Sequence, residues 1–348
     1  MAHLDFDSVK DATLVAEAVA RWAEHEWQGP VTVRSATTLS GGLDNFVHAI
    51  GLDGEALPAP WQQDLVIRIA PSQQRLTHVR EEMLLQNWIA DRGYPAPRVL
   101  GLLRENWNFQ LPAQIAALVP GVQLLDEVKA HPQRMKELIG LLAKLHVDLH
   151  QLDHTDWPTA DATGTAAIKR TRLVHERIEA GRADLSVAMR QVQTGLDWCA
   201  AHPVDPTICH GDFHPLNVVF DTATGAAVVV DWTDVTLDDP HSDIARTATL
   251  FRCAAIAGGS AIERVALRLV GPLLARMYLR AYGQLRPFDR QRLRHWEALH
   301  LLNGLAQLDL LNDPVAETSA AGQSFPPWIG RSIERRLQRT LRRAATAT

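Results

Sequence analysis

Cysteines are scarce in this sequence, and long apolar runs are missing. The chain has three cysteines, too few and too widely spaced for a disulfide framework or a structural zinc site; they are Cys199, Cys209 and Cys253. Each apolar stretch is interrupted well before the roughly 18 residues that identify a membrane-spanning helix. The N-terminal stretch MAHLDFDSVKDATL carries acids and has no apolar signal segment. We therefore expect a cytoplasmic protein with no membrane partner.

A basic excess is lacking as well. The 348 residues include 35 Lys and Arg against 40 Asp and Glu, and the formal net charge is -5. A general nucleic-acid-binding protein normally concentrates positive charge on one face. One segment, RSIERRLQRTLRR at 331–343, is basic, and we interpret it as the solvated face of a last helix in preference to a site for an anionic partner. We expect a small-molecule partner and no nucleic acid.

The hydrophobic patterns divide the chain into two parts. The stretches VTVRSATTL, NFVHAIGL and DLVIRIAP are typical of strands, and helical spacing dominates after the Pro-Gly connector. These patterns predict an α+β fold with a small strand-rich N-terminal lobe over 1–118, a connector over 119–122 and a larger, mainly helical lobe over 123–348. One hairpin, formed by NVVF and AAVVVDW, is embedded in the helical lobe.

The stretch ICHGDFHPLNVVFD at 208–221 concentrates polar groups directly before that hairpin. A turn centred near Thr224 would place Asn217 opposite Asp231. Directly opposed residues have Cβ atoms about 5 Å apart, so this amide and this carboxylate could bind one Mg²⁺ ion. Asp212 lies five residues before Asn217 and could face the same space without binding the metal.

Two other interpretations of this stretch remain open. A zinc site would need His210 and His214 on one helix face, which Gly211 and Pro215 disfavour. An ordinary polar turn would explain any one of these residues, but it does not explain the pairing of an amide and a carboxylate across the hairpin.

The segments HGDFHPLN and VVVDWTD resemble motifs of the aminoglycoside phosphotransferase and choline kinase-like family. The resemblance extends over roughly 39–251 and includes LSGGLDNFVHAI, REEMLLQNW, LLAKLH and DDPHSDIART. It implies a two-lobed protein-kinase-like fold. It also implies Mg²⁺-dependent transfer of phosphate from ATP or GTP to a hydroxyl group of a small molecule.

The resemblance assigns a role to each matching residue. Asp212 is the catalytic residue that orients the acceptor hydroxyl, and Asn217 and Asp231 hold the metal. The nucleotide phosphates are contacted by a loop that contains Ser40, Gly41, Gly42 and Asn45. They are also contacted by Arg68, a cation on the third strand that is paired with Glu81 of the next helix. Four residues have supporting roles: His210, His214, Asp239 and Asp243. For the two aspartates we favour bracing of the catalytic loop. For His214, a contact to phosphate and simple packing are both open.

The sequence departs from the family pattern in two places. Arg68 stands where lysine is usual, although several subgroups of the family resemble this chain in having arginine there. The connector AALVPGVQ lacks an acidic residue that is often present, which leaves the choice between ATP and GTP open.

The acceptor is also left open. Five aspartates between 231 and 243 would attract Mg²⁺ and a cationic acceptor, such as an aminoglycoside or an amino alcohol. A neutral acceptor is compatible as well, and a macrolide and a sugar are further candidates. Candidate lining residues of the acceptor pocket are Trp232, Tyr278, Tyr282, Trp296 and Glu297.

Two other functions compete with a small-molecule kinase. The first is a catalytically silent, kinase-fold regulatory module, which the intact Asp212, Asn217 and Asp231 disfavour. The second is a protein kinase, but no segment after Asp231 resembles an activation loop that ends in A-P-E.

Overall fold

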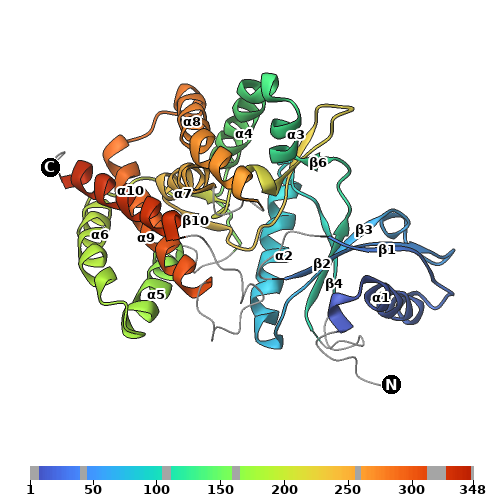
Figure 1. The fold of residues 1–348 in the computed structure, drawn as a ribbon. Coiled ribbons are helices and arrows are strands. Elements are labelled where there is room, and N and C mark those ends of the chain that lie inside the picture. The colour runs from blue at the N-terminus through green and yellow to red at the C-terminus, as the bar shows by residue number, and fades with distance from the viewer. Residues whose placement is uncertain are drawn as a thin grey trace. The chain divides into compact units, whose positions relative to one another are not determined.

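The computed structural model describes residues 8–39, 45–103, 111–158, 165–254, 260–311 and 327–345. The chain forms two compact units, coloured by residue number in Figure 1. The first unit comprises 1–122 and 219–233, and the second comprises 123–218 and 234–348. The hairpin therefore groups with the N-terminal unit, although we had included it in a continuous lobe over 123–348. The lobe boundaries of the kinase-like fold stay a prediction.

A five-stranded antiparallel sheet forms the centre of the first unit. The strand order is β1-β2-β3-β5-β4, and the bounds are Thr32–Thr38 (β1), Phe46–Asp53 (β2), Leu65–Ile69 (β3), Val99–Leu103 (β4) and Ala113–Ala117 (β5). Strand β3 is paired on both sides, so that Arg68 lies beside Val47 of β2 and Gln114 of β5. Ile67 and Ile69 are fully buried. Because side chains alternate along a strand, Arg68 points to the opposite face of the sheet.

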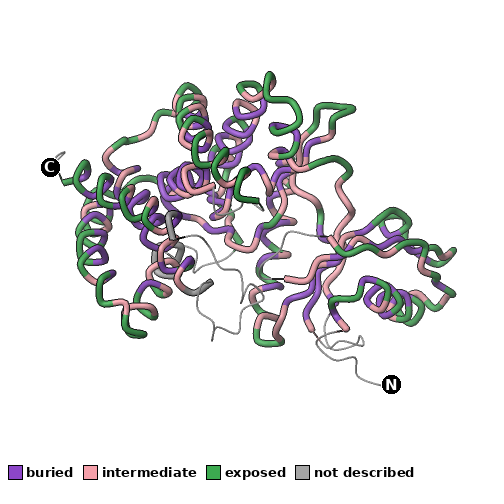
Figure 2. Tube along the Cα trace, in the orientation of Figure 1, coloured by how far each residue is buried: buried purple, intermediate pink, exposed green. Residues whose placement is uncertain are grey.

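In the described residues of this unit, two α-helices accompany the sheet, α1 (Ala12–Trp27) and α2 (Leu76–Asp91). Asp11 caps α1 by accepting a hydrogen bond from the Thr13 backbone N–H at 2.8 Å. The apolar face of α1 joins one core cluster with the sheet, and Figure 2 shows buried residues in both. Short 3₁₀ helices are Ser8–Lys10 (η1), Ala59–Trp61 (η2) and Gln73–Arg75 (η3).

The hairpin consists of β8 (Val218–Phe220) and β9 (Ala227–Val229), in a three-stranded sheet of order β6-β8-β9 with β6 at Val122–Gln123. The Asp221 N–H donates to the Ala226 carbonyl at 2.9 Å, which shifts the register by one residue from our prediction. Neither Asn217 nor Asp231 lies in the paired strands, so their direct opposition there is wrong.

Two contacts explain why this hairpin belongs to the first unit. The Val229 N–H donates to the Pro95 carbonyl at 2.7 Å. Gly121, with φ +134°, lies so close to the hairpin that a Cβ atom there would be 2.5 Å from the Phe220 carbonyl oxygen. A larger residue at 121 would separate these two segments.

The second unit is mainly helical. Its helices are Leu124–Ala130 (α3), Met135–His150 (α4), Thr165–Glu179 (α5), Asp184–Ala201 (α6), Pro240–Arg252 (α7), Ala261–Leu285 (α8), Arg290–Leu311 (α9) and Pro327–Ala345 (α10), with 3₁₀ helices at Pro132–Arg134 (η4) and Pro215–Asn217 (η5). Strands β7 (Thr207–Cys209) and β10 (Thr236–Asp238) pair antiparallel. Helix α7 packs against α8 and α9, and α4 packs against α8. Among the described helices, none is both long and apolar enough to cross a membrane.

Candidate active site

Arg68 is the centre of a polar cluster in the first unit. Its Nη1 atom donates to Asp231 Oδ1 at 2.9 Å and to Thr233 Oγ1 at 3.1 Å. Its Nη2 atom donates to Gln114 Oε1 at 3.3 Å and forms an ion pair with Glu82. Burial lowers the pKa of Arg68, and the attraction of Asp231 counteracts this effect. An arginine keeps its charge under such conditions, so the cluster holds a fixed cation against two carboxylates.

The partner of Arg68 on helix α2 differs from our prediction. We expected Glu81, but Glu81 is exposed, whereas Glu82 is 3% exposed and pairs with Arg68. Consecutive helical residues point about 100° apart. The face of α2 that covers the sheet therefore carries Glu82, and the pairing with Glu81 is wrong.

Asp231 has an unusual backbone. Its φ is +65°, in the left-handed region that aspartate tolerates better than most residues. Thr233 Oγ1 donates to Asp231 Oδ1 at 2.8 Å, the same oxygen that accepts from Arg68. Within the described ranges Oδ2 accepts no hydrogen bond, and the side chain is 46% exposed. One carboxylate oxygen is therefore held in place, while the other has no hydrogen-bond partner among the described residues.

In the second unit, two side chains fix the Asp212 carboxylate, one on each oxygen. Arg246 of α7 donates to Oδ1 from Nε at 3.0 Å and lies 2.9 Å away at Nη2. His214 Nε2 lies 3.2 Å from Oδ2. Burial alone would raise the pKa of Asp212, but Arg246, His214 and Arg170 outweigh it and lower that pKa far below its ordinary value. The carboxylate is therefore ionised and oriented.

The loop backbone is anchored as well. Gly211 has φ +81°, and a Cβ atom there would lie 2.6 Å from both Cβ and the carbonyl oxygen of Asp234, so this turn requires glycine. Arg170 of α5 donates to the Gly211 carbonyl oxygen. Asn217 donates from Nδ2 to the Asp212 carbonyl oxygen at 3.0 Å. That bond leaves the Asn217 amide oxygen as an acceptor.

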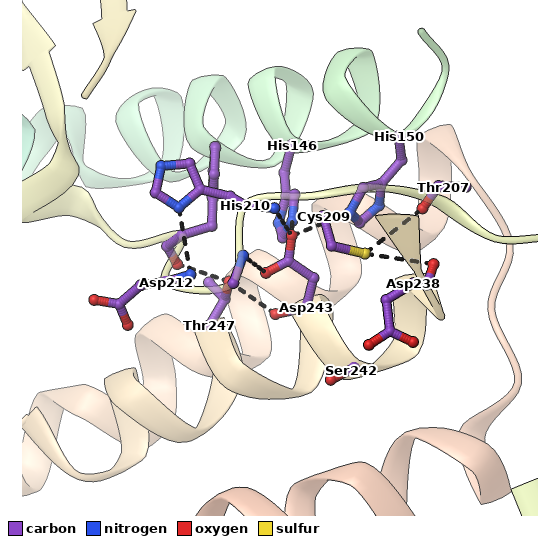
Figure 3. A network of polar contacts seen from close by, with 12 residues as sticks. His146, His150, Thr207, Cys209, His210, Asp212, Asp238, Ser242, Asp243 and Thr247 are labelled. Carbon is purple, nitrogen blue, oxygen red and sulfur yellow. Dashed lines mark hydrogen bonds and ion pairs between the residues drawn. The ribbon is translucent and has the colours of Figure 1, made fainter. Parts of the chain in front are cut away.

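Asp243 of α7 lies beneath this loop, as Figure 3 shows. Its Oδ2 accepts from the His210 backbone N–H at 2.6 Å, and its Oδ1 accepts from Gly211 N–H at 3.0 Å. His146 and His150 of α4 also contact Oδ2, at 3.0 Å and 3.4 Å from their Nε2 atoms. Burial alone would raise the pKa of Asp243, but the two histidines hold it well below its ordinary value. Asp243 therefore joins α4 and α7 to the backbone that presents Asp212.

The other supporting residues have structural contacts too. His210 is buried, and its Nδ1 accepts from the Asp212 N–H at 3.3 Å. Asp239 caps α7 by accepting from the His241 N–H at 2.9 Å, and its Oδ2 accepts from Trp296 Nε1 at 2.7 Å and from Arg292. Asp239 thus links the start of α7 to α9.

The aromatic residues that we expected to line the acceptor pocket are buried in the core, so that part of the prediction is wrong. Tyr278 and Tyr282 are fully buried and contact His146 and His150 through their hydroxyl groups, the second at 2.7 Å. Trp232 is also fully buried. Trp296 and Glu297 are less than 10% exposed. Apolar rings at helical spacing belong to the core here, as such patterns usually do.

Several contributors to these clusters were missed by the sequence interpretation; they are Glu82, Gln114, Thr233, His146, His150, Arg170 and Arg246. Glu82 was passed over for its neighbour, and Thr233 was noted only as part of a motif. Arg170 and Arg246 lie 76 residues apart in the chain, and no local pattern connects either of them with Asp212. Among the nucleotide-loop residues, Ser40, Gly41 and Gly42 lie outside the described ranges; Asn45 immediately precedes β2.

Sequence comparison reveals a curated relative with a known activity class. The aminoglycoside 3'-phosphotransferase of Streptomyces fradiae is 26% identical over 290 residues, which cover 80% of this chain and 96% of the relative.

Solved structures share the fold at low identity. A thermostable mutant of aminoglycoside phosphotransferase APH(4)-Ia, in a ternary complex with ADP and hygromycin B, has a TM-score of 0.60 at 16% identity, covering 92% of this chain and 98% of that one. Plasmodium vivax ethanolamine kinase has a TM-score of 0.54 at 12% identity, covering 87% and 82%. These likenesses confirm the predicted α+β, kinase-like fold. The chain belongs to the phosphotransferase enzyme family, whose model matches residues 35–296.

Proposed function

We propose that the protein transfers the terminal phosphate of ATP or GTP to a hydroxyl group of a small molecule, with Mg²⁺ as the metal. The observation that carries this proposal is the state of Asp212, an ionised carboxylate fixed by Arg246 and His214 in a loop whose backbone Asp243 anchors.

Asp212 orients the acceptor hydroxyl. A carboxylate whose pKa lies far below its ordinary value is a weak base, because general-base efficiency is best when the pKa lies near the working pH. Asp212 therefore accepts a hydrogen bond from the hydroxyl and aims its oxygen at the phosphate. The hydroxyl proton passes to Asp212, and from there to water, only late in the transfer, when bond formation to phosphorus and release of the nucleoside diphosphate have made it acidic. Catalysis of this kind relies on positioning and charge neutralisation.

The donor atoms of two residues fit a magnesium ion. Asp231 offers the carboxylate oxygen that accepts no hydrogen bond in the described residues, and Asn217 offers its amide oxygen. Hard oxygen ligands are the ones that Mg²⁺ prefers. The ion would neutralise charge on the phosphates. Because Asn217 and Asp231 belong to different units, their sharing of one ion stays a prediction from the sequence.

Arg68 binds phosphate oxygens in this proposal. Its guanidinium group is held by Glu82 and Gln114, which fix the plane of the fork before a nucleotide arrives. Nη1 is paired with Asp231 and Thr233 in this structure, so phosphate binding requires Nη1 to exchange these partners for phosphate oxygens while Glu82 and Gln114 keep holding Nη2. Nε and Nη1 would then contact phosphate through two parallel N–H groups, which the ammonium group of lysine cannot do.

The acceptor is a hydroxylated small molecule, and a polycation is not required. Of the five aspartates between 231 and 243, three are at least 90% buried: Asp238, Asp239 and Asp243. Asp231 and Asp234 are about half exposed. The negative field is therefore weaker than the sequence suggests. An antibiotic such as an aminoglycoside or macrolide is one candidate, and this burial favours an amino alcohol or a sugar as the second.

A release assay for nucleoside diphosphate tests the proposal. We would offer ATP and GTP, each with and without Mg²⁺, together with aminoglycosides, macrolides, amino alcohols and sugars. We expect acceptor-dependent release that needs Mg²⁺ and that Asp212→Asn lowers by about 10²- to 10⁴-fold while nucleotide binding persists. Nucleotide binding with no transfer to any acceptor class would instead support a silent regulatory module.

A further inference from the structure

A groove lined by arginines lies between α8 and α10. It has a volume of about 220 Å³, and its lining residues are Arg268 of α8 and Arg331, Ser332, Arg335 and Arg339 of α10. A single water molecule needs a cavity of only about 10–15 Å³, so the groove is large enough for a ligand bigger than a water molecule. None of these residues belongs to the clusters around Asp212 or Arg68.

Helix geometry explains why the arginines converge. Arg331, Arg335 and Arg339 follow one another at intervals of four, so they form one row along α10. The residues Ile333, Leu337 and Leu341, offset from this row by two positions, are buried. Helix α10 packs mainly against α9. The buried face fixes the rotation of α10 and therefore keeps the arginine row on its outer side.

The row of arginines on α10 brings positive charge to this groove. Among the described residues that line it, four carry guanidinium groups and none is a carboxylate. In the part of the chain that the structure describes, Arg331, Arg335 and Arg339 form no ion pair. Like charges at intervals of four repel one another on a helix. An anion in the groove would remove that repulsion.

We propose that this groove binds a soluble ligand that carries two or more linked phosphate groups. Arginine pairs with phosphate through two parallel hydrogen bonds, and Ser332 adds a hydroxyl donor. The row from Arg331 to Arg339 spans about 12 Å along the helix axis, at about 1.5 Å per residue. A single phosphate contacts only part of such a row. The solvated helix face that we expected from the sequence thus forms one wall of an anion site.

Calorimetric titration with inorganic tripolyphosphate, without Mg²⁺, tests this inference on the whole 348-residue chain. We expect the double variant Arg335→Gln/Arg339→Gln to bind tripolyphosphate about 100-fold more weakly than the parent protein. A charge-assisted hydrogen bond contributes roughly a factor of ten to the affinity, and this variant loses one such bond from each arginine. The matched control is Arg276→Gln/Arg280→Gln, which removes the same charge from the exposed face of α8 outside the groove. It should retain the affinity of the parent within about two-fold.

Two further measurements exclude other sources of the observed binding. Arg68→Gln removes the cation proposed for the nucleotide site, so the tripolyphosphate binding that this variant retains reports on the groove. Vesicles of neutral and anionic phospholipid separate a lipid headgroup from a soluble phosphate. Four outcomes would each overturn the proposal. The first two are an equal loss of tripolyphosphate affinity in both double variants and a loss confined to Arg68→Gln. The other two are vesicle binding without tripolyphosphate binding and no binding at all.

Discussion

His150 makes the stability of the protein sensitive to acid in a way that one substitution can isolate. Its ring is fully buried between Asp243 and the Tyr282 hydroxyl, and its backbone carbonyl accepts a hydrogen bond from Arg286 at 2.6 Å. Burial, reinforced by the neighbouring His146, lowers the pKa of His150 from 6.5 to about 3. The folded protein therefore keeps this imidazole neutral over most of the acidic range.

The sign of the effect follows from proton binding. Below pH 6.5 the unfolded chain binds a proton at His150 that the folded chain does not bind until about pH 3, so acid favours unfolding. Each pH unit in this window contributes about 1.4 kcal/mol. Lowering the pH from about 7.5 to about 5 should therefore cost about 2 kcal/mol of unfolding free energy through His150 alone. Asp243, whose pKa lies well below 3.8, does not titrate in this window.

Urea unfolding of the parent and of His150→Gln at these two pH values measures the effect. Other buried histidines are present in both proteins and cancel in the comparison, as does any constant cost of the substitution. We expect the parent to lose about 2 kcal/mol more than the variant. His25→Gln, on the exposed end of α1, should lose as much as the parent. Equal losses in the parent and His150→Gln would refute the assignment of a neutral, buried His150.

Three further outcomes are expected. Asp212→Asn should keep nucleotide affinity within about two-fold and lower kcat by about 10²- to 10⁴-fold, measured by calorimetry and diphosphate release; near-normal turnover would contradict the proposed mechanism. Glu82→Gln should lower the unfolding free energy by about 3 kcal/mol, because it leaves a buried arginine with one carboxylate fewer, whereas Glu81→Gln should change it by less than about 0.5 kcal/mol in the same urea titration. Gly211→Ala should cost about 1–3 kcal/mol, because its Cβ would clash with Asp234 and its φ disfavours a side chain; unaltered stability and turnover would show that the loop relaxes freely.

Much of the fold could be predicted because it depends on local patterns. Alternation of apolar residues predicted the strands around Arg68, and helical spacing predicted the segments after the connector. Residue types within ten positions of Asp212 were enough to single out this stretch as the candidate catalytic loop, and its catalytic role stays a prediction. The hairpin register failed by one residue because the turn geometry, and not the strand pattern, sets it.

The sequence by itself determined which groups are available: an aspartate in a glycine-broken loop, an amide five residues later, and a cation in the third strand. Only the tertiary structure decided which of them meet. Glu81 and Glu82 are equally suitable in sequence, and the packing of α2 on the sheet selects Glu82. Arg170 and Arg246 reach the loop of Asp212 from separate helices, and His146 and His150 reach Asp243 from a third. Local patterns extend over a few residues, whereas contacts between distant segments depend on how helices rotate as their apolar faces are buried.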